Sequence, residues 1–199
     1  MKNTPTLSKR GLLAAILLAI APVGTQAQME SDPTPNPDGK PNADLKTETE
    51  TTNKTSSLSA SDQKFVEKAA QGNMLEIETS ELAVKNGTST EVKDFGKMMV
   101  TDHGKAGKEL KSIVKSKGVT LPTELDEKHK TKYDKLAAMS GSDFDKAYSK
   151  QMVTDHEKMI TLFETASQKC DDAELKAFAT STLPKLKEHL EHTKHLTAK

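Results

Sequence analysis

The chain has 199 residues, of which 34% are hydrophobic and only 4% aromatic, and its basic and acidic residues balance at 29 each. Arg10 is the only arginine. Proteins that read nucleic acids or phosphates depend on arginine side chains, so this composition argues against a nucleic-acid partner. The single cysteine, Cys170, excludes an intramolecular disulfide, so a folded domain must be stabilised by packing.

The N-terminal segment has the features of an export signal. Two lysines and Arg10 precede an apolar run over residues 11–21, and the small-residue sequence Thr25-Gln26-Ala27 follows where a signal peptidase would read it. The run is shorter than the ~20 residues that a membrane span requires. We therefore predict a signal peptide over residues 1–27, export to the periplasm or cell envelope, and no transmembrane segment in the mature chain. That mature chain carries 26 lysines and 29 acidic residues, a formal net charge of −3.

Residues 28–60 are predicted to form a disordered tether. The segment begins with four prolines spaced among polar residues and continues as a stretch rich in threonine, glutamate and lysine. Leu45 and Leu58 are its only large aliphatic residues, so it buries too little apolar surface to offset the entropy of ordering. The tether is either a spacer that holds the domain away from a surface or a solvated tail without a specific partner.

A helical pattern begins after the tether. The first predicted helix covers residues 61–86 and is stopped by Gly87. The second begins after Ser89 and reaches Lys117. Gly118 follows it at the position where glycine most often ends a helix, so the pattern predicts two consecutive helices joined by a short connection.

A shorter third helix is predicted over residues 124–139, where Ser140-Gly141 breaks the pattern. Ser142 is then predicted to cap a fourth helix that extends to Lys169. Asp145, three residues after this serine, is the expected capping-box partner.

The fifth helix is predicted to start at Asp171 and Asp172, which cap it, and to continue to the C-terminus with a kink at Pro184. No segment of this part of the chain alternates between apolar and polar residues as a strand does. The expected fold class is therefore all-α: one domain over residues 61–199, built as a four-helix bundle with an extra short helix.

The sequence Met-Val-Thr-Asp-His occurs twice, at residues 99–103 and 152–156. Each copy places its histidine on the apolar side of a long helix, ~21 Å from the start of that helix. A glutamate of the first helix and a histidine of the last lie at a similar depth. Three imidazoles and a carboxylate that meet inside an apolar bundle would suit Zn²⁺, Fe or Mn. The predicted ligands of such an ion are Glu76, His103, His156 and His189.

Three further polar residues are predicted to lie around these ligands without binding the ion themselves. Asp102 and Asp155 each precede a histidine of the repeat, so each points about 100° away from the ring and cannot share its ligand face. Glu164 lies two turns beyond His156 and is the third predicted supporting group. No Glu-x-x-His motif occurs at the depth of the histidines, which argues against a di-iron carboxylate centre and its oxidase chemistry.

Several short sequences occur in a fixed order over residues 65–196. They are Gly72-Asn73-Met74-Leu75-Glu76, Val92-Lys93-Asp94-Phe95, the first copy of the repeat, Phe144-Asp145-Lys146-Ala147-Tyr148, Leu175-Lys176-Ala177-Phe178-Ala179 and Leu183-Pro184-Lys185-Leu186-Lys187-Glu188-His189-Leu190. In these residues the chain resembles DUF4142, a bacterial family of exported helical domains of unknown function that are often labelled outer membrane proteins. The resemblance implies a ferritin-like bundle in the periplasm or envelope, with residues 118–141 as a crossover. It implies no established activity, and it would make the four predicted ligands the polar core of the family.

Three functions remain open at this point. The first is an exported bundle that binds a transition metal or holds a pH-sensitive histidine cluster, and that acts in metal handling or envelope stress rather than as a turnover enzyme. The second is a structural or interaction module that docks on an envelope protein without any metal. The third is a metal-dependent oxidase or peroxidase, against which the missing Glu-x-x-His motif counts. The sequence leaves homo-oligomerisation open.

Overall fold

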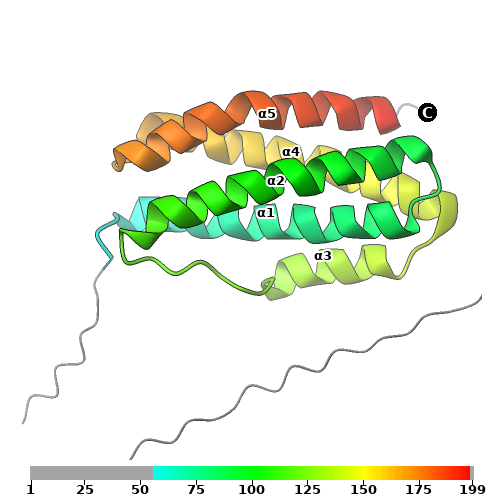
Figure 1. The fold of residues 1–199 in the computed structure, drawn as a ribbon, viewed down its shortest axis with the longest axis horizontal. Helices are drawn as coiled ribbons and strands as arrows, with labels where there is room; N and C mark the ends of the chain where they lie inside the picture. The colour runs from blue at the N-terminus through cyan, green and yellow to red at the C-terminus, as the bar shows by residue number, and fades with distance from the viewer. Residues whose placement is uncertain (1–55, 198–199) are drawn as a thin grey trace, which may run out of the picture. The chain divides into compact units, whose positions relative to one another are not determined.

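The computed structural model describes residues 56–197, which form five α-helices and no strand within that range (Figure 1). This confirms the predicted all-α class with four long helices and one short helix. The predicted signal peptide, and the predicted tether up to residue 55, lie outside the described residues. No helix among the described residues is long and apolar enough to cross a membrane. The helices are α1 (Ala60–Asn86), α2 (Thr90–Lys115), α3 (Glu127–Ala137), α4 (Gly141–Lys169) and α5 (Ala173–Thr197).

The four long helices form two hairpins, α1 with α2 and α4 with α5. The hairpins pack against each other through contacts of α1 with α4 and of α2 with α5. Residues 116–140 connect the hairpins and carry α3, which lies along the outside of α1 (Figure 1). This long connection returns the chain to the end where α2 began, so α4 runs in the same direction as α2.

Most helix ends have the caps that the sequence indicates. The Ser59 side chain accepts a hydrogen bond from the Asp62 main-chain N–H at the start of α1, and Ser89 does the same for Glu91 at the start of α2. Gly118 follows α2 with a φ of 71°, a left-handed conformation that glycine adopts without strain. Of the two aspartates predicted to cap α5, Asp172 accepts hydrogen bonds from two main-chain N–H groups in the first turn, whereas Asp171 donates its own N–H to Asp62.

The predicted capping box at the start of α4 is wrong. The helix begins at Gly141, one residue before Ser142, and the carboxylate of Asp145 does not bond within its own helix end. It accepts hydrogen bonds from the main-chain N–H groups of Thr88 (3.0 Å) and Ser89 (2.8 Å) in the connection between α1 and α2. Asp145 therefore ties the two hairpins together, because two otherwise unpaired N–H groups ahead of α2 face it from the other hairpin.

We expect Asp145→Ala to lower the free energy of unfolding by about 2 kcal/mol, since hydrogen bonds to a charged acceptor contribute about 1.5–3 kcal/mol. Urea unfolding followed by circular dichroism measures the change. Asp94→Ala is the matched control, because Asp94 makes only an exposed pair with Lys97 and its loss costs at most about 0.5 kcal/mol. Equal effects of the two substitutions would contradict the bridging role of Asp145.

The apolar core consists of two clusters, one toward each end of the bundle. The first includes Phe65 of α1 and Phe163 of α4, whose rings meet edge to face, and it also buries Leu58 ahead of α1. The second includes Phe95 of α2 and Tyr148 of α4. The segment of each long helix that lies between the two clusters carries a buried polar residue, so the polar residues form a layer inside an otherwise apolar bundle.

Candidate metal centre

Each of the four long helices contributes one polar side chain to the layer between the apolar clusters. Glu76 comes from α1, His103 from α2, His156 from α4 and His189 from α5. None of the four is more than 4% exposed. The structure thus brings together all four residues that the sequence analysis selected as ligands, at the level where the helical rise places them.

The three histidines form a compact cluster. One ring nitrogen from each lies within 4.8 Å of the corresponding nitrogens of the other two. The closest approach joins His103 Nε2 to His189 Nδ1 at 3.3 Å, and the ring centroids are 5.3–5.7 Å apart. Because nitrogens bound to one ion at about 2.0–2.1 Å lie within roughly 3–4 Å of one another, small side-chain adjustments would bring these three into a common coordination sphere.

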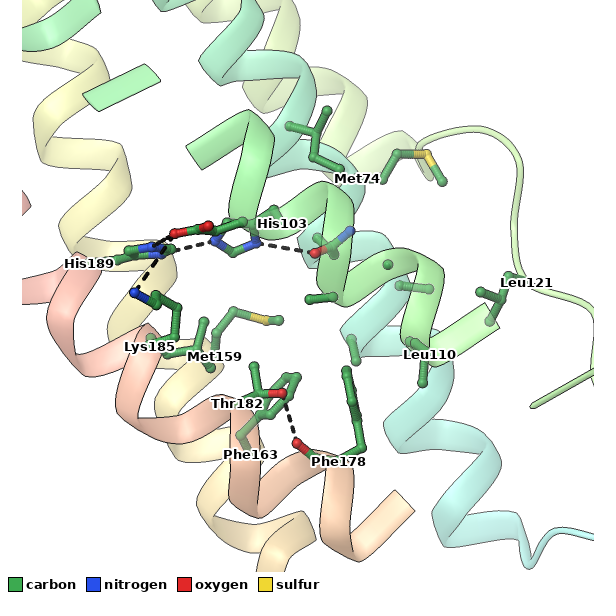
Figure 2. A pocket seen from close by; sticks show the side chains of 18 of the residues that line it. Met74, His103, Leu110, Leu121, Met159, Phe163, Phe178, Thr182, Lys185 and His189 are labelled. Carbon is green, nitrogen blue, oxygen red and sulfur yellow. Dashed lines mark hydrogen bonds and ion pairs between the residues drawn. The ribbon is translucent and has the colours of Figure 1, made fainter. Parts of the chain in front are cut away.

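The nitrogen on the other side of each ring faces a hydrogen-bond acceptor. His103 Nδ1 lies 3.1 Å from Asn73 Oδ1, and His156 Nδ1 lies 2.9 Å from the Met152 carbonyl oxygen one turn earlier in α4. His189 Nε2 lies 3.2 Å from Asp102 Oδ2 (Figure 2). When each ring donates an N–H to its acceptor, the second nitrogen carries a lone pair. Only His156 Nε2 is then without a partner, because His103 Nε2 and His189 Nδ1 face each other at 3.3 Å.

The Glu76 carboxyl group lies at the Nδ1 side of the His103 and His156 rings. Its Oε2 is 3.2 Å from His103 Nδ1 and its Oε1 is 3.4 Å from His156 Nδ1. Neither oxygen has a hydrogen-bond partner, and the same is true of His156 Nε2. Buried polar atoms without partners are rare and costly in folded proteins, so three of them in one layer make this layer a candidate ligand site.

The electrostatics favour neutral rings. Burial lowers the pKa of His103 well below its usual range, with the neighbouring imidazoles adding to the effect. Burial also lowers the pKa of His156 to about 4 and that of His189 below its usual value. The pKa of Glu76 is raised well above its usual value, first by burial and then by the nearby Asp155 carboxylate. Neutral imidazole is the protonation state that coordinates metals, so the rings are ready to bind at neutral pH.

The three predicted supporting residues have different surroundings. Asp102 contacts His189 as described and also lies 3.6 Å from Lys105. Asp155 is buried and pairs with Lys132 of α3 rather than with a ring. Glu164 lies outside the centre, where its side chain is 47% exposed and forms an ion pair with Lys187.

An apolar pocket of about 220 Å³ adjoins the centre on one side (Figure 2). It extends from His103 and His189 along the bundle interior toward Phe163 and Phe178. Met159 lies between the histidines and these two aromatic rings (Figure 2). The pocket walls are almost entirely hydrocarbon, so this side offers little to stabilise a charged group that leaves water.

Residues 47–196 match the family described as Domain of unknown function (DUF4142). The chain belongs to the DUF4142 family. No curated protein matches it. The polar layer and all four long helices of this DUF4142 domain, except the last residue of α5, lie within the matched residues.

Solved structures with a similar fold are helical bundles with low sequence identity to this DUF4142 chain. A DUF305 fragment from Deinococcus radiodurans superposes with a TM-score of 0.63 at 7% identity, covering 71% of this chain and 97% of that one. CopM in the Cu(II)-bound form gives 0.59 at 17% identity, with 69% and 95% coverage. CopM in a silver-bound form gives 0.56 at 19% identity, with 67% and 92% coverage. At these identities the likeness shows the fold of the DUF4142 domain.

Two contacts of the candidate centre were not predicted from the sequence. Asn73 lies one turn before Glu76 on the same face of α1, and this spacing alone was a usable signal for its contact with His103. No sequence pattern indicates the pairing of Lys132 with Asp155. The α3 helix is rich in charged residues, and its position against the bundle follows from the tertiary structure.

Proposed function

We propose that this protein binds one transition-metal ion in the layer between its two hairpins. The ligands are His103 Nε2, His156 Nε2 and His189 Nδ1. The observation that carries the proposal is the unpartnered Nε2 of His156, a buried lone pair that faces no donor and belongs to a cluster of three neutral imidazoles. The opposite nitrogen of each ring has an acceptor, which is the arrangement that orients histidine ligands in metal sites.

Glu76 acts in this proposal as a supporting acceptor rather than as the fourth ligand. Its oxygens approach the Nδ1 atoms of His103 and His156, on the far side of those rings from the proposed ligand nitrogens. A bound cation would favour the ionised carboxylate and so lower the raised pKa of Glu76. The two charges would then compensate each other inside the apolar bundle.

The metal follows from the ligand type. Imidazole nitrogens suit zinc, iron and copper, and they also accept manganese, although carboxylate oxygens suit manganese better. Our sequence-based expectation of Zn²⁺, Fe or Mn therefore stands as a proposal, and the copper-bound form of CopM supports adding Cu²⁺ to the panel. By the Irving–Williams order, we expect affinity to rise from Mn²⁺ through Fe²⁺ to Cu²⁺, with Zn²⁺ below Cu²⁺.

The proposed role is metal handling in the periplasm or cell envelope after export through the signal predicted over residues 1–27. The buried position of the cluster supports binding and storage rather than turnover. A second function has one observation in its favour, because each histidine already has a hydrogen-bond partner. In that case the layer is a polar core that specifies helix register, and the protein is an interaction module without a metal.

Metal titration of the purified mature chain distinguishes the two functions. After treatment with a chelator, the protein is dialysed against Zn²⁺, Mn²⁺, Fe²⁺ or Cu²⁺ and analysed for bound metal. We expect one ion per chain and, at a free metal concentration of about 100 times Kd, a stabilisation of about 3 kcal/mol. For a domain of this size, that corresponds to a rise in Tm of roughly 8 °C. Absence of bound metal and an unchanged Tm for all four ions would overturn the proposal in favour of the metal-free module.

A further inference from the structure

A second cavity, distinct from the apolar pocket, also reaches the polar layer. It lies between α1, α3 and α4 and has a volume of about 740 Å³. We call it the α3 cleft. Glu76 and Asp155 both line it, so the cleft extends from the surface near α3 to a carboxylate that touches two of the proposed ligand histidines.

The inner end of the α3 cleft carries two buried carboxylates and one ammonium group. Asp155 is 6% exposed and pairs with the Nζ of Lys132, while its second oxygen, Oδ2, has no hydrogen-bond partner. Both oxygens of Glu76 are also without partners. Asp155 Oδ2 therefore has unused cation-binding capacity in a buried place. Glu76, whose raised pKa favours the protonated form, gains such capacity when an entering cation displaces its proton.

The outer rim of the cleft is different in character. Its charged side chains are exposed and belong to four lysines and two acidic residues, so they are solvated and screened by salt. The buried charges at the inner end are screened much less. Screening therefore weakens the effect of the rim, whose net charge is +2, more than that of the Asp155–Lys132 pair at the inner end.

The apolar pocket is a poor alternative path for an ion. A metal ion that crosses it passes mainly apolar side chains, and the carboxylate of its lining, Asp102, already contacts His189, Lys105 and Lys185. In the α3 cleft, carboxylate oxygens replace water molecules as the ion moves inward. The cleft thus leads from water to Asp155 and then to Glu76, whose oxygens lie on the Nδ1 side of His103 and His156, so a cation must still pass these rings to reach the proposed ligand nitrogens.

We propose that the α3 cleft is the entry route of the metal ion, and that the Lys132 ammonium group is a built-in counter-ion that holds Asp155 until an entering cation displaces it. This inference rests on the proposed function. In the apo chain the ammonium group compensates Asp155, and it must swing outward with its flexible side chain before the carboxylate becomes available to a metal. Lys132 is suited to this movement because it is partly exposed and lies on the short helix that the crossover attaches to the bundle.

Association kinetics test the proposal. Stopped-flow mixing of the apo protein with Zn²⁺ and a competing chromophoric chelator yields the association rate constant. We expect Lys132→Met to raise this constant by about fivefold or more, and Asp155→Asn to lower it by a similar factor. Lys130→Met is the matched control: it removes the same charge from α3, but Lys130 pairs only with the exposed Asp134. We expect its rate to stay within about twofold of that of the unmodified protein.

A charge-conserving variant covers the case in which Lys132→Met leaves Asp155 uncompensated and the chain fails to fold. Lys132→Arg keeps the pair, and the planar guanidinium group can hold a carboxylate with two hydrogen bonds. We expect it to slow metal association by about twofold or more. The entry route is overturned if Lys132→Met and Lys132→Arg bind metal at the rate of the unmodified protein. It is also overturned if Lys130→Met accelerates binding as much as Lys132→Met does. In either case, one bound ion per chain would leave the proposed function intact. If the unmodified protein binds no ion, both proposals fall.

Discussion

We expect His156→Ala to lower metal affinity by more than 100-fold and to remove the metal-dependent rise in Tm. Of the ring nitrogens in the histidine cluster, His156 Nε2 is the one without a partner, and its ring is fully buried between α1, α2 and α5. Because the loss of a supporting group alone costs about 10–100-fold in affinity, the loss of a ligand costs more. Metal analysis after dialysis and thermal unfolding with and without Zn²⁺ measure the two effects.

The comparison must separate a lost ligand from a damaged fold. His195→Ala is the control, since His195 is exposed near the end of α5 and lies outside the cluster. It should bind one ion with unchanged affinity. His103→Ala, which removes the ligand on α2, should reproduce the loss. Retention of full metal affinity by both His103→Ala and His156→Ala would rule out the three-histidine centre.

The second large effect concerns the stability of the metal-free protein in acid. The pKa of His156 is about 4 in the folded chain, against about 6.5 in an unfolded one, and those of His103 and His189 are also lowered. Between these pH values the unfolded chain binds more protons than the folded chain. The contribution of these histidines to the free energy of unfolding is therefore fully present above pH 6.5 and is lost as pH falls toward 4. His156 alone accounts for about 3 kcal/mol of this loss.

Glu76 has the opposite effect on the pH dependence of stability. Its raised pKa means that the folded chain holds a proton that the unfolded chain has released, so Glu76 alone would make the protein more stable as pH falls toward 4.5. One such group opposes three histidines, and the net result is acid destabilisation. Urea unfolding in the presence of a chelator from pH 7 to pH 4 should show a falling midpoint. His156→Gln should flatten the dependence, and a midpoint that is constant or rises toward pH 4 would contradict the neutral cluster.

The sequence predicted the centre because helical rise is regular. Similar spacing of His103 and His156 from the starts of their helices, 13 residues after Thr90 and 15 after Gly141, was enough to place them at one level, and the two hairpins then brought the rings together. Glu164 shows the limit of this reasoning. Eight residues after His156 correspond to a rotation of about 80°, which turns its side chain away from the centre toward Lys187.

Contacts between distant segments were not accessible from local patterns. Capping rules predicted that the Asp145 side chain forms hydrogen bonds at the start of its own helix. Its carboxylate instead accepts hydrogen bonds from main-chain N–H groups 56 and 57 residues earlier. The Lys132–Asp155 pair depends in the same way on how the crossover lies against the bundle. Local propensity fixes where helices begin and end to within a few residues, while partners across the bundle follow from packing.

The distribution of the polar layer over the hairpins has a consequence for assembly. Glu76 and His103 belong to the first hairpin, and His156 and His189 to the second, so neither half holds all the residues of the proposed centre. The long connection between the halves is the element through which two chains would exchange hairpins. A domain-swapped dimer formed in this way would rebuild two intact centres, whereas a proteolytic fragment with a single hairpin would have none.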